Sequence, residues 1–134
     1  MARLATVTLL VREYDEALLY YTTILGFHVV RDTDMGSGRR FVVVAPNTAE
    51  CSGAALLLAR ASNEQQIAAI GNQTGGRVAF FLEVENFSAV YARYVAAGVV
   101  FIEEPRHEPY GTVAVFKDLY ANLWDLIEPK KSTA

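Results

Sequence analysis

Arg77 and Asp125 are the charged residues best placed to do chemistry, because each lies in an otherwise apolar segment, RVAFFLE and LWDLIE. If both segments are strands, Arg77 shares a side with Phe81, and Asp125 shares a side with Leu123 and Ile127. A charge buried alone is very costly, so Arg77 needs a partner. Two interpretations stay open: an ion pair between Arg77 and Asp125, or a guanidinium that binds an anionic or carbonyl-bearing ligand.

A second set of residues could transfer protons. His107 lies in the segment EPRHEPYG. Histidine is the side chain most often used as a general acid or base near neutral pH, and the alternative is a solvated loop residue. Tyr110 could add a hydroxyl group to the same site, or only pack. Glu83 and Asp125 are the other candidate bases, whereas the Glu103–Glu104 pair would face opposite sides of a strand. The sequence contains no phosphate-binding loop and no Ser or Cys nucleophile motif.

Two segments that position these residues repeat one plan. Residues 10–27, LVREYDEALLYYTTILGF, and residues 82–99, LEVENFSAVYARYVAAGV, each run strand, polar turn, amphipathic helix, glycine, second strand. Gly26 and Gly98 are separated by the same number of residues as the starts of the two segments. Two copies are too few for a solenoid, and a fold built twice from one unit usually places its ligand site between the copies. We therefore expect one pseudo-symmetric domain.

Periodicity and turn residues predict the order βαβββ, helix, βαβββ, which is an α+β fold. The expected strands are 4–11, 27–31, 40–45, 54–59, 77–83, 99–102, 111–116 and 123–127. Helices are expected from Asp15, from Ser62 with Gln65 at the capping-box spacing, and after Asn86 or Ser88. We expect turns at 32–38 and 118–122 and a loop at 103–110. The expected organisation is module 1 at about 1–60, a linker helix at about 62–76 and module 2 at about 77–128, within one domain.

Composition narrows the class of protein. The chain has 134 residues, of which 52% are hydrophobic, enough for a sizeable core. Its net charge of −3 argues against binding nucleic acid. No apolar run is long enough for a membrane span, and the start lacks a signal-peptide pattern. Cys51 is the single cysteine, which fits a reducing compartment. We expect a cytoplasmic protein that binds neither nucleic acid nor membrane.

Three segments resemble the vicinal oxygen chelate superfamily, which includes glyoxalase I, bleomycin-resistance proteins, fosfomycin-resistance enzymes and extradiol dioxygenases. The segments are VTLLVREYDEALLYYTTILGF, GGRVAFFLEV and GTVAVFKDLYANLWDLIEP. The resemblance implies two βαβββ modules that form a half-open, barrel-like curved sheet, and it implies a homodimer. In the last segment Ala121 replaces the glycine of the usual Asp-x-x-Gly-Asn turn. If the turn needs a positive φ, Ala121 costs about 1 kcal/mol.

The resemblance also locates the metal site of the metal-dependent members, in which four side chains hold a divalent ion. The matching positions here are Thr6, Leu56, Arg77 and Asp125. Leucine has no lone pair to offer, a threonine hydroxyl is a weak ligand, and arginine repels a cation. Only Asp125 can ligate a metal strongly. We therefore expect no metal and no other cofactor. In the ion-pair interpretation Arg77 and Asp125 fill the place of the ion, and in the other interpretation Arg77 binds the ligand.

Three classes of function remain open. The favoured one is a metal-independent small-molecule-binding protein of the glyoxalase/bleomycin-resistance type, with its ligand in the barrel cleft. The second is a glyoxalase-like lyase or isomerase that uses non-standard residues or a metal. The third is a structural or regulatory dimer with a vestigial pocket. Trp124, opposite in parity to Asp125, is expected to pack against a helix. The residues expected to line the pocket are Thr6, Thr8, Phe41, Leu56, Arg77, Phe81, His107, Tyr110 and Asp125.

Overall fold

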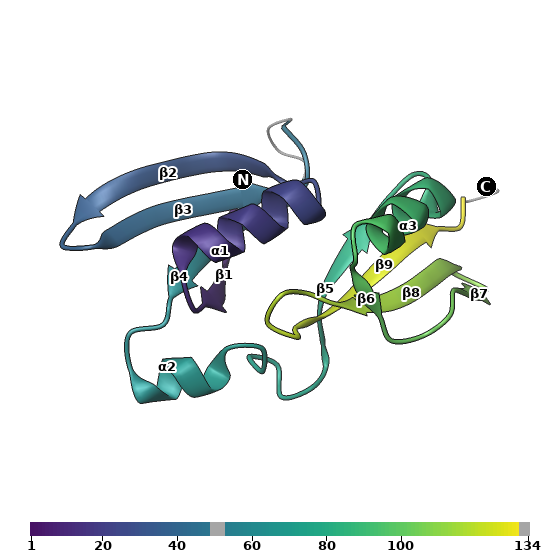
Figure 1. The fold of residues 1–134 in the computed structure, drawn as a ribbon. Helices are drawn as coiled ribbons and strands as arrows, with labels where there is room; N and C mark the ends of the chain where they lie inside the picture. The colour runs from purple at the N-terminus through teal and green to yellow at the C-terminus, as the bar shows by residue number, and fades with distance from the viewer. Residues whose placement is uncertain (49–52, 132–134) are drawn as a thin grey trace. The chain divides into compact units, whose positions relative to one another are not determined.

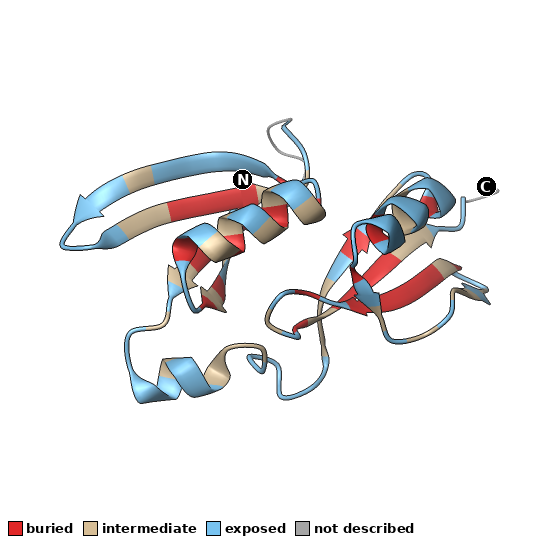
Figure 2. Cartoon of the chain, in the orientation of Figure 1, coloured by how far each residue is buried: buried red, intermediate tan, exposed pale blue. Residues whose placement is uncertain are grey.

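The computed structural model describes residues 1–48 and 53–131, which form two compact units, Met1–Ile70 and Gly71–Ala134. Each unit has its own sheet (Figure 1) and its own buried residues (Figure 2). Cys51 lies outside the described residues. Among the residues that are described, no helix has the length and apolar character needed to cross a membrane.

The first unit is built on a four-stranded sheet with the strand order β1-β4-β3-β2. The strands β1 and β4 run parallel, and the other two pairings are antiparallel. Its elements are β1 (Thr6–Val11), α1 (Tyr14–Leu19), the π-helical turn η1 (Tyr20–Ile24), β2 (His28–Gly36), β3 (Arg39–Ala45), β4 (Ala55–Arg60) and α2 (Glu64–Ala69).

The second unit repeats this plan. Its five-stranded sheet has the order β5-β9-β8-β6, with β7 also paired to β8, and its first and last strands, β5 and β9, again run parallel. The elements are β5 (Val78–Glu83), α3 (Phe87–Ala96), β6 (Val100–Phe101), β7 (Arg106–Glu108), β8 (Gly111–Lys117) and β9 (Leu123–Pro129). The predicted α+β class and the duplication of one βαβββ unit are confirmed.

The helix of the first unit packs on one face of its sheet. Ala17, Tyr21 and Leu25 recur at helical spacing and are buried, and α1 contacts β3 and β4 (Figure 2). Gly26 ends the helix as predicted, with a φ of 79°, and the Phe27 N–H donates to the Tyr21 carbonyl at 2.8 Å. The fully buried strand residues are Leu9, Val11, Val42, Val44 and Leu58.

Aromatic side chains form the core of the second unit. The ring of Phe116 lies 5.6 Å from that of Tyr94 on α3 and 5.9 Å from that of Trp124 on β9. Phe80 on β5 closes the cluster, with its ring 4.6 Å from Trp124. Because α3 also contacts β9, the prediction that Trp124 packs on the helix side is confirmed.

Two expected irregular segments contain strands instead. The predicted turn at 32–38 is wrong, because β2 continues to Gly36 and the chain reverses at Ser37–Gly38. An edge strand with exposed side chains can contain polar residues. The Asp and Thr residues of this segment therefore did not indicate a turn. The predicted loop at 103–110 contains β7. Prolines at both ends of that short strand, Pro105 and Pro109, concealed it.

Two helix starts can be compared with their predicted caps. Asn86 caps α3, and its side chain accepts a hydrogen bond from the Ala89 N–H at 3.1 Å. For α2 the predicted cap Ser62 is wrong by one residue. The Asn63 side chain accepts from the Gln66 N–H at 2.8 Å, so the cap and its partner both shift by one position.

The turn before β9 carries Ala121 in a left-handed conformation, with a φ of 71°. The turn is held by buried Asp118, which accepts hydrogen bonds from the Asn122 N–H at 2.9 Å and from the Trp124 indole N–H at 3.1 Å. The backbone there cannot relax to a negative φ without breaking these bonds. The alanine therefore carries the conformational cost that a glycine would avoid.

Replacing Ala121 by glycine is expected to raise the free energy of unfolding by about 0.5–1 kcal/mol, since the relief of strain exceeds the extra entropy of an unfolded glycine. Urea denaturation measures the change. Ala92→Gly, at an exposed position inside α3, is the matched control and should lower stability by about 1 kcal/mol. A loss of stability in both variants would show that the turn does not strain Ala121.

Candidate functional site

Asp125 lies on the face of the second sheet opposite to α3. Its neighbour Trp124 points to the helix side, and alternation along β9 turns Asp125 to the other face. Phe81 on β5 and Val115 on β8 are its partners in the strand register. Asp125 therefore sits between two apolar residues, and one of them, Phe81, is 67% exposed.

The carboxyl group of Asp125 is buried and incompletely bonded. The residue is only 8% exposed, and its Oδ1 has no hydrogen-bond partner among the described residues. Burial raises the pKa of Asp125 above its usual value; the positive charge of Arg106 lowers this pKa, and the negative charge of Glu103 raises it further. A perturbed carboxyl group with a free acceptor is the chemical feature expected of a binding or proton-transfer site.

Arg106 on β7 organises the charges near Asp125. Its Nε donates to Glu103 Oε2 at 3.0 Å, and its Nη1 donates to Glu108 Oε1 at 2.8 Å. Glu103 Oε2 also accepts the Val115 N–H at 3.1 Å, which anchors Glu103 to the middle of β8. We call Asp125, Glu103, Arg106 and Glu108 the Asp125 cluster. Within it, Arg106 is bonded to the two glutamates, and Asp125 is influenced only through space by the charges of Arg106 and Glu103.

Sequence reasoning missed Arg106 and Glu108. In β7 they are separated by one residue and so lie on the same side of the strand, but the segment was expected to be a loop. Glu103 was considered only as a pair with its neighbour Glu104, although it binds Arg106, three residues further along the chain. The alternation of charge in Arg-His-Glu was the available signal, and three residues are too few to distinguish it from chance.

The other predicted pocket residues of the second unit are dispersed. Tyr110 follows β7 and is exposed, and its hydroxyl group contributes, after Glu103 and Glu108, to raising the pKa of Arg106. His107 pairs in register with Thr112, and its Nδ1 lies 3.3 Å from the Thr112 hydroxyl, on the α3 side of the sheet. Arg77 precedes β5 and is exposed, and in the described part of the chain it forms no ion pair with Asp125. The expected Arg77–Asp125 pair is therefore not what the structure shows.

In the first unit, Thr6, Thr8 and Phe41 share one face of the sheet, and Leu56 does not. Thr8 is in register with Leu57, which in turn is in register with Val43, two residues from Phe41. Leu56 is in register with Val7 and Val44 and is buried on the helix side. A run of three leucines has no polar–apolar alternation that would show which of them faces which side of the sheet. Leu57, and not Leu56, lies on the face of the other predicted pocket residues.

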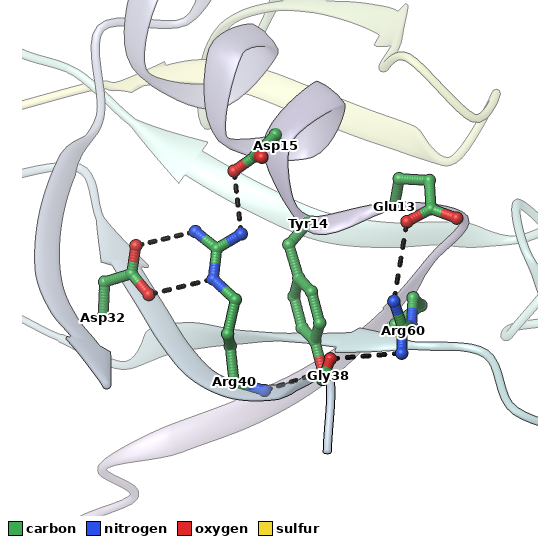
Figure 3. A network of polar contacts seen from close by, with 7 residues as sticks. All are labelled: Glu13, Tyr14, Asp15, Asp32, Gly38, Arg40 and Arg60. Atoms are coloured by element: carbon green, nitrogen blue, oxygen red, sulfur yellow. Dashed lines mark hydrogen bonds and ion pairs between the residues drawn. The ribbon is translucent and has the colours of Figure 1, made fainter. Parts of the chain in front are cut away.

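The first unit also contains a polar network, shown in Figure 3, that connects the start of α1 to the sheet. Arg40 Nη1 donates to Asp15 at 2.8 Å, and its Nη2 donates to Asp32 at 2.8 Å, which lowers the pKa of Asp32. Tyr14 lies between Arg40 and Arg60, whose guanidinium carbons are 5.2 and 5.3 Å from the centre of its ring. The guanidinium of Arg40 is thus already satisfied, so we assign this network to structure.

A hollow of about 430 Å³ lies beside this network at the end of the β2–β3 hairpin. Its acidic groups have partners within the unit: Asp32 binds Arg40, and Asp34 accepts the Gly36 N–H at 2.8 Å. The hollow therefore lacks the unsatisfied acceptor that Asp125 provides. The residues that line it are Asp32, Asp34, Gly36, Ser37, Gly38 and Arg40.

The four positions matched to the superfamily's metal ligands do not fit a divalent ion. Leu56 is turned into the core, and Arg77 presents a permanent cation. Thr6 begins β1 with an exposed hydroxyl, which leaves Asp125 as the only carboxylate of the four. Within residues 1–48 and 53–131, no three His, Cys, Asp or Glu side chains are grouped to hold a metal.

Comparison of the sequence with known proteins gives both a family and relatives. Residues 3–126 match the model of the Glyoxalase/Bleomycin resistance protein/Dioxygenase superfamily. An uncharacterized protein of Shewanella frigidimarina (strain NCIMB 400) is 46% identical over 123 residues, which cover 91% of this chain and 90% of the relative. The uncharacterized protein YetH of Bacillus subtilis (strain 168) is 27% identical, over 94% of this chain and 98% of its own length.

Solved structures share the fold. UcmS2 has a TM-score of 0.80 and 33% identity, over 96% of this chain and 98% of its own. TnmS3, described as an antibiotic binding protein from Streptomyces sp. CB03234, has a TM-score of 0.76 and 23% identity, over 97% and 98% of the two chains. With a family model that spans nearly all of its length, the chain belongs to the Glyoxalase/Bleomycin resistance protein/Dioxygenase superfamily.

Proposed function

We propose that this chain is a small-molecule-binding protein that holds its ligand without a metal, on the Asp125 face of the second unit. The observation that carries the proposal is the buried Asp125 carboxyl group, whose Oδ1 has no hydrogen-bond partner in the described residues. A ligand that donates a hydrogen bond to this oxygen would supply what the chain does not. Exposed Phe81, its partner in the register, offers an apolar surface for the rest of the ligand.

The unpartnered oxygen of Asp125 has a free-energy cost in the unliganded protein. A buried acceptor without a partner costs about 1–3 kcal/mol, more when it is charged. Residues that destabilise a protein in this way are typical of binding and catalytic sites, where the missing interaction is made by the ligand. Among the described residues, no other buried side-chain nitrogen or oxygen lacks a hydrogen-bond partner. Asp118, for example, is bonded to Asn122 and Trp124.

The relatives support ligand binding at the level of the fold. The superfamily description includes bleomycin resistance proteins, and TnmS3, which shares the fold, is described as an antibiotic binding protein. Fold likeness alone does not assign a ligand. It supports the proposal, because TnmS3, described as an antibiotic binding protein, has the same fold.

A lyase or isomerase activity is the second candidate, favoured by the raised pKa of Asp125. A carboxyl group whose pKa is shifted toward neutrality can both accept and return a proton. A glyoxalase assay with and without added Zn²⁺ or Ni²⁺ distinguishes the two functions. Turnover that Asp125→Asn abolishes would replace the binding proposal with the enzymatic one.

Asp125→Asn is expected to stabilise the unliganded protein at neutral pH by about 1 kcal/mol, because an amide buried there carries no charge to desolvate. The folded pKa of Asp125 is raised, so its ionisation in the native state opposes folding, and stability is lost as pH rises through that pKa. The extra free energy of unfolding of the variant, relative to the wild type, should therefore decrease as pH falls. Urea unfolding at a series of pH values measures it; a variant less stable than the wild type at neutral pH contradicts the assignment.

Binding is expected to survive removal of metals. The probe is indole-3-acetamide, a neutral aromatic molecule with N–H donors, titrated in the presence of EDTA and followed by amide NMR. Saturable shifts centred on residues 81, 115 and 125 are expected, unchanged when Zn²⁺ replaces EDTA. Elemental analysis of protein purified without chelator should give well below one Ni, Zn, Mn or Fe per chain. Stoichiometric metal that is lost in Asp125→Ala would overturn the proposal.

We also propose that the protein works as a homodimer in the cytoplasm. The superfamily resemblance and the single cysteine support this assignment. Light scattering coupled to gel filtration is expected to give twice the chain mass of 14.7 kDa. A mass of one chain that does not change with protein concentration would contradict the dimer.

A further inference from the structure

The Asp125 cluster has an excess of negative charge that its own residues do not neutralise. Arg106 is its one cation, and both of the guanidinium nitrogens described above are directed at Glu103 and Glu108, at 3.0 and 2.8 Å. Asp125 contributes a third carboxylate, whose buried Oδ1 has no hydrogen-bond partner in the described residues. An anionic ligand would be repelled here, while a cation would meet an acceptor that is already desolvated.

The neighbour of Asp125 in the strand register is suited to an apolar or aromatic group. Phe81 is 67% exposed, and in the parallel β5–β9 pair its side chain lies on the same face as Asp125. An exposed phenyl ring beside a carboxylate can hold a cation over its face and the attached apolar group against its edge. Val115, on the other side of Asp125, keeps the surroundings apolar.

We propose that the ligand of this site is an arylalkylamine in its protonated form, with the ammonium group bound to the carboxyl group of Asp125 and the ring packed on Phe81. This proposal rests on the proposed function and names the chemical class of its ligand. A charge-assisted hydrogen bond is roughly twice as strong as a neutral one, so the protonated amine is favoured over an amide of the same shape. Glu103 and Glu108 add attraction at longer range, limited by salt screening.

The first unit offers a contrast that makes the inference specific. The carboxylates near its hollow are engaged within the unit, Asp32 by Arg40 and Asp34 by the backbone of Gly36. Asp32 and Asp34 are carboxylates, as Asp125 is, but neither of them is a buried acceptor without a partner. Charge alone would therefore predict amine binding at either place, whereas an unsatisfied desolvated carboxyl group predicts it only at Asp125.

Three indoles with short side chains at the same ring position and different net charge test the proposal: tryptamine is cationic, indole-3-acetamide is neutral, and indole-3-acetate is anionic. Affinities for the full chain are measured by NMR titration at neutral pH in EDTA. Tryptamine is expected to bind about tenfold more tightly than the amide, and the acetate more weakly than either. Asp125→Asn should weaken tryptamine about tenfold and leave the amide nearly unchanged.

Asp34→Asn is the matched control, because it removes the same charge from an exposed position in the first unit. It should change the affinity for tryptamine by no more than about twofold. Phe81→Leu keeps an apolar side chain and removes the ring, and should weaken tryptamine more than it weakens the amide. Native amide spectra of each variant confirm that it is folded.

The outcomes separate this inference from the proposed function. Equal affinities for the three indoles, or preference for the acetate, would overturn the amine assignment and leave small-molecule binding standing. No saturable shift with any of them at residues 81, 115 or 125 would overturn both. Equal losses in Asp125→Asn and Asp34→Asn would show that tryptamine responds only to net charge, which also contradicts a specific site.

Discussion

Each sheet of this protein has two faces, and the helix of the unit covers one of them. This constraint decides which side chains are available for binding. Along β9, Trp124 and Leu126 are buried on the helix side, and Asp125 between them is turned to the opposite face. A shift of register by one residue would exchange these faces, burying the carboxyl group under α3 and exposing the indole ring. The aromatic packing of Trp124 on Phe116 and the hydrogen bond of its indole N–H to Asp118 oppose such a shift.

The two units show how a duplicated frame can diverge in its polar chemistry. In the first unit a long strand, β2, forms the edge, and its Asp32 shares Arg40 with Asp15, so helix, edge strand and β3 are tied together. In the second unit the corresponding edge is divided between β6 and β7. That division brings Glu103 and Arg106 next to the middle of β8, beside Asp125. The same topology thus supports a satisfied network in one unit and an unsatisfied carboxyl group in the other.

The charge of Asp125 has a cost for the stability of the folded protein. Its pKa is raised because the surroundings disfavour its charge, so the ionised native protein is less stable than it would be with an uncharged residue. Arg106 does not remove this cost, since its hydrogen bonds go to the two glutamates. Under the proposed function, a ligand that donates a hydrogen bond would meet an acceptor already held in place by the sheet, and a preorganised acceptor loses little freedom on binding.

The sequence by itself determined the repeated βαβββ order, the α+β class and the position of Gly26 as the end of the first helix. Periodicity and the conformational freedom of glycine are local properties of the chain. It also singled out Asp125, an acid within an apolar strand, and the parity that separates it from Trp124. Tertiary structure alone decided the partners. Arg77 was expected to pair with Asp125, but it lies before β5 and is exposed, while the cation near Asp125 is Arg106, from a segment that looked like a loop. Leu56 and Leu57 could not be told apart until the β1–β4–β3 register was known. Which charges meet across a sheet depends on pairing between strands distant in the chain, and no local pattern encodes that pairing.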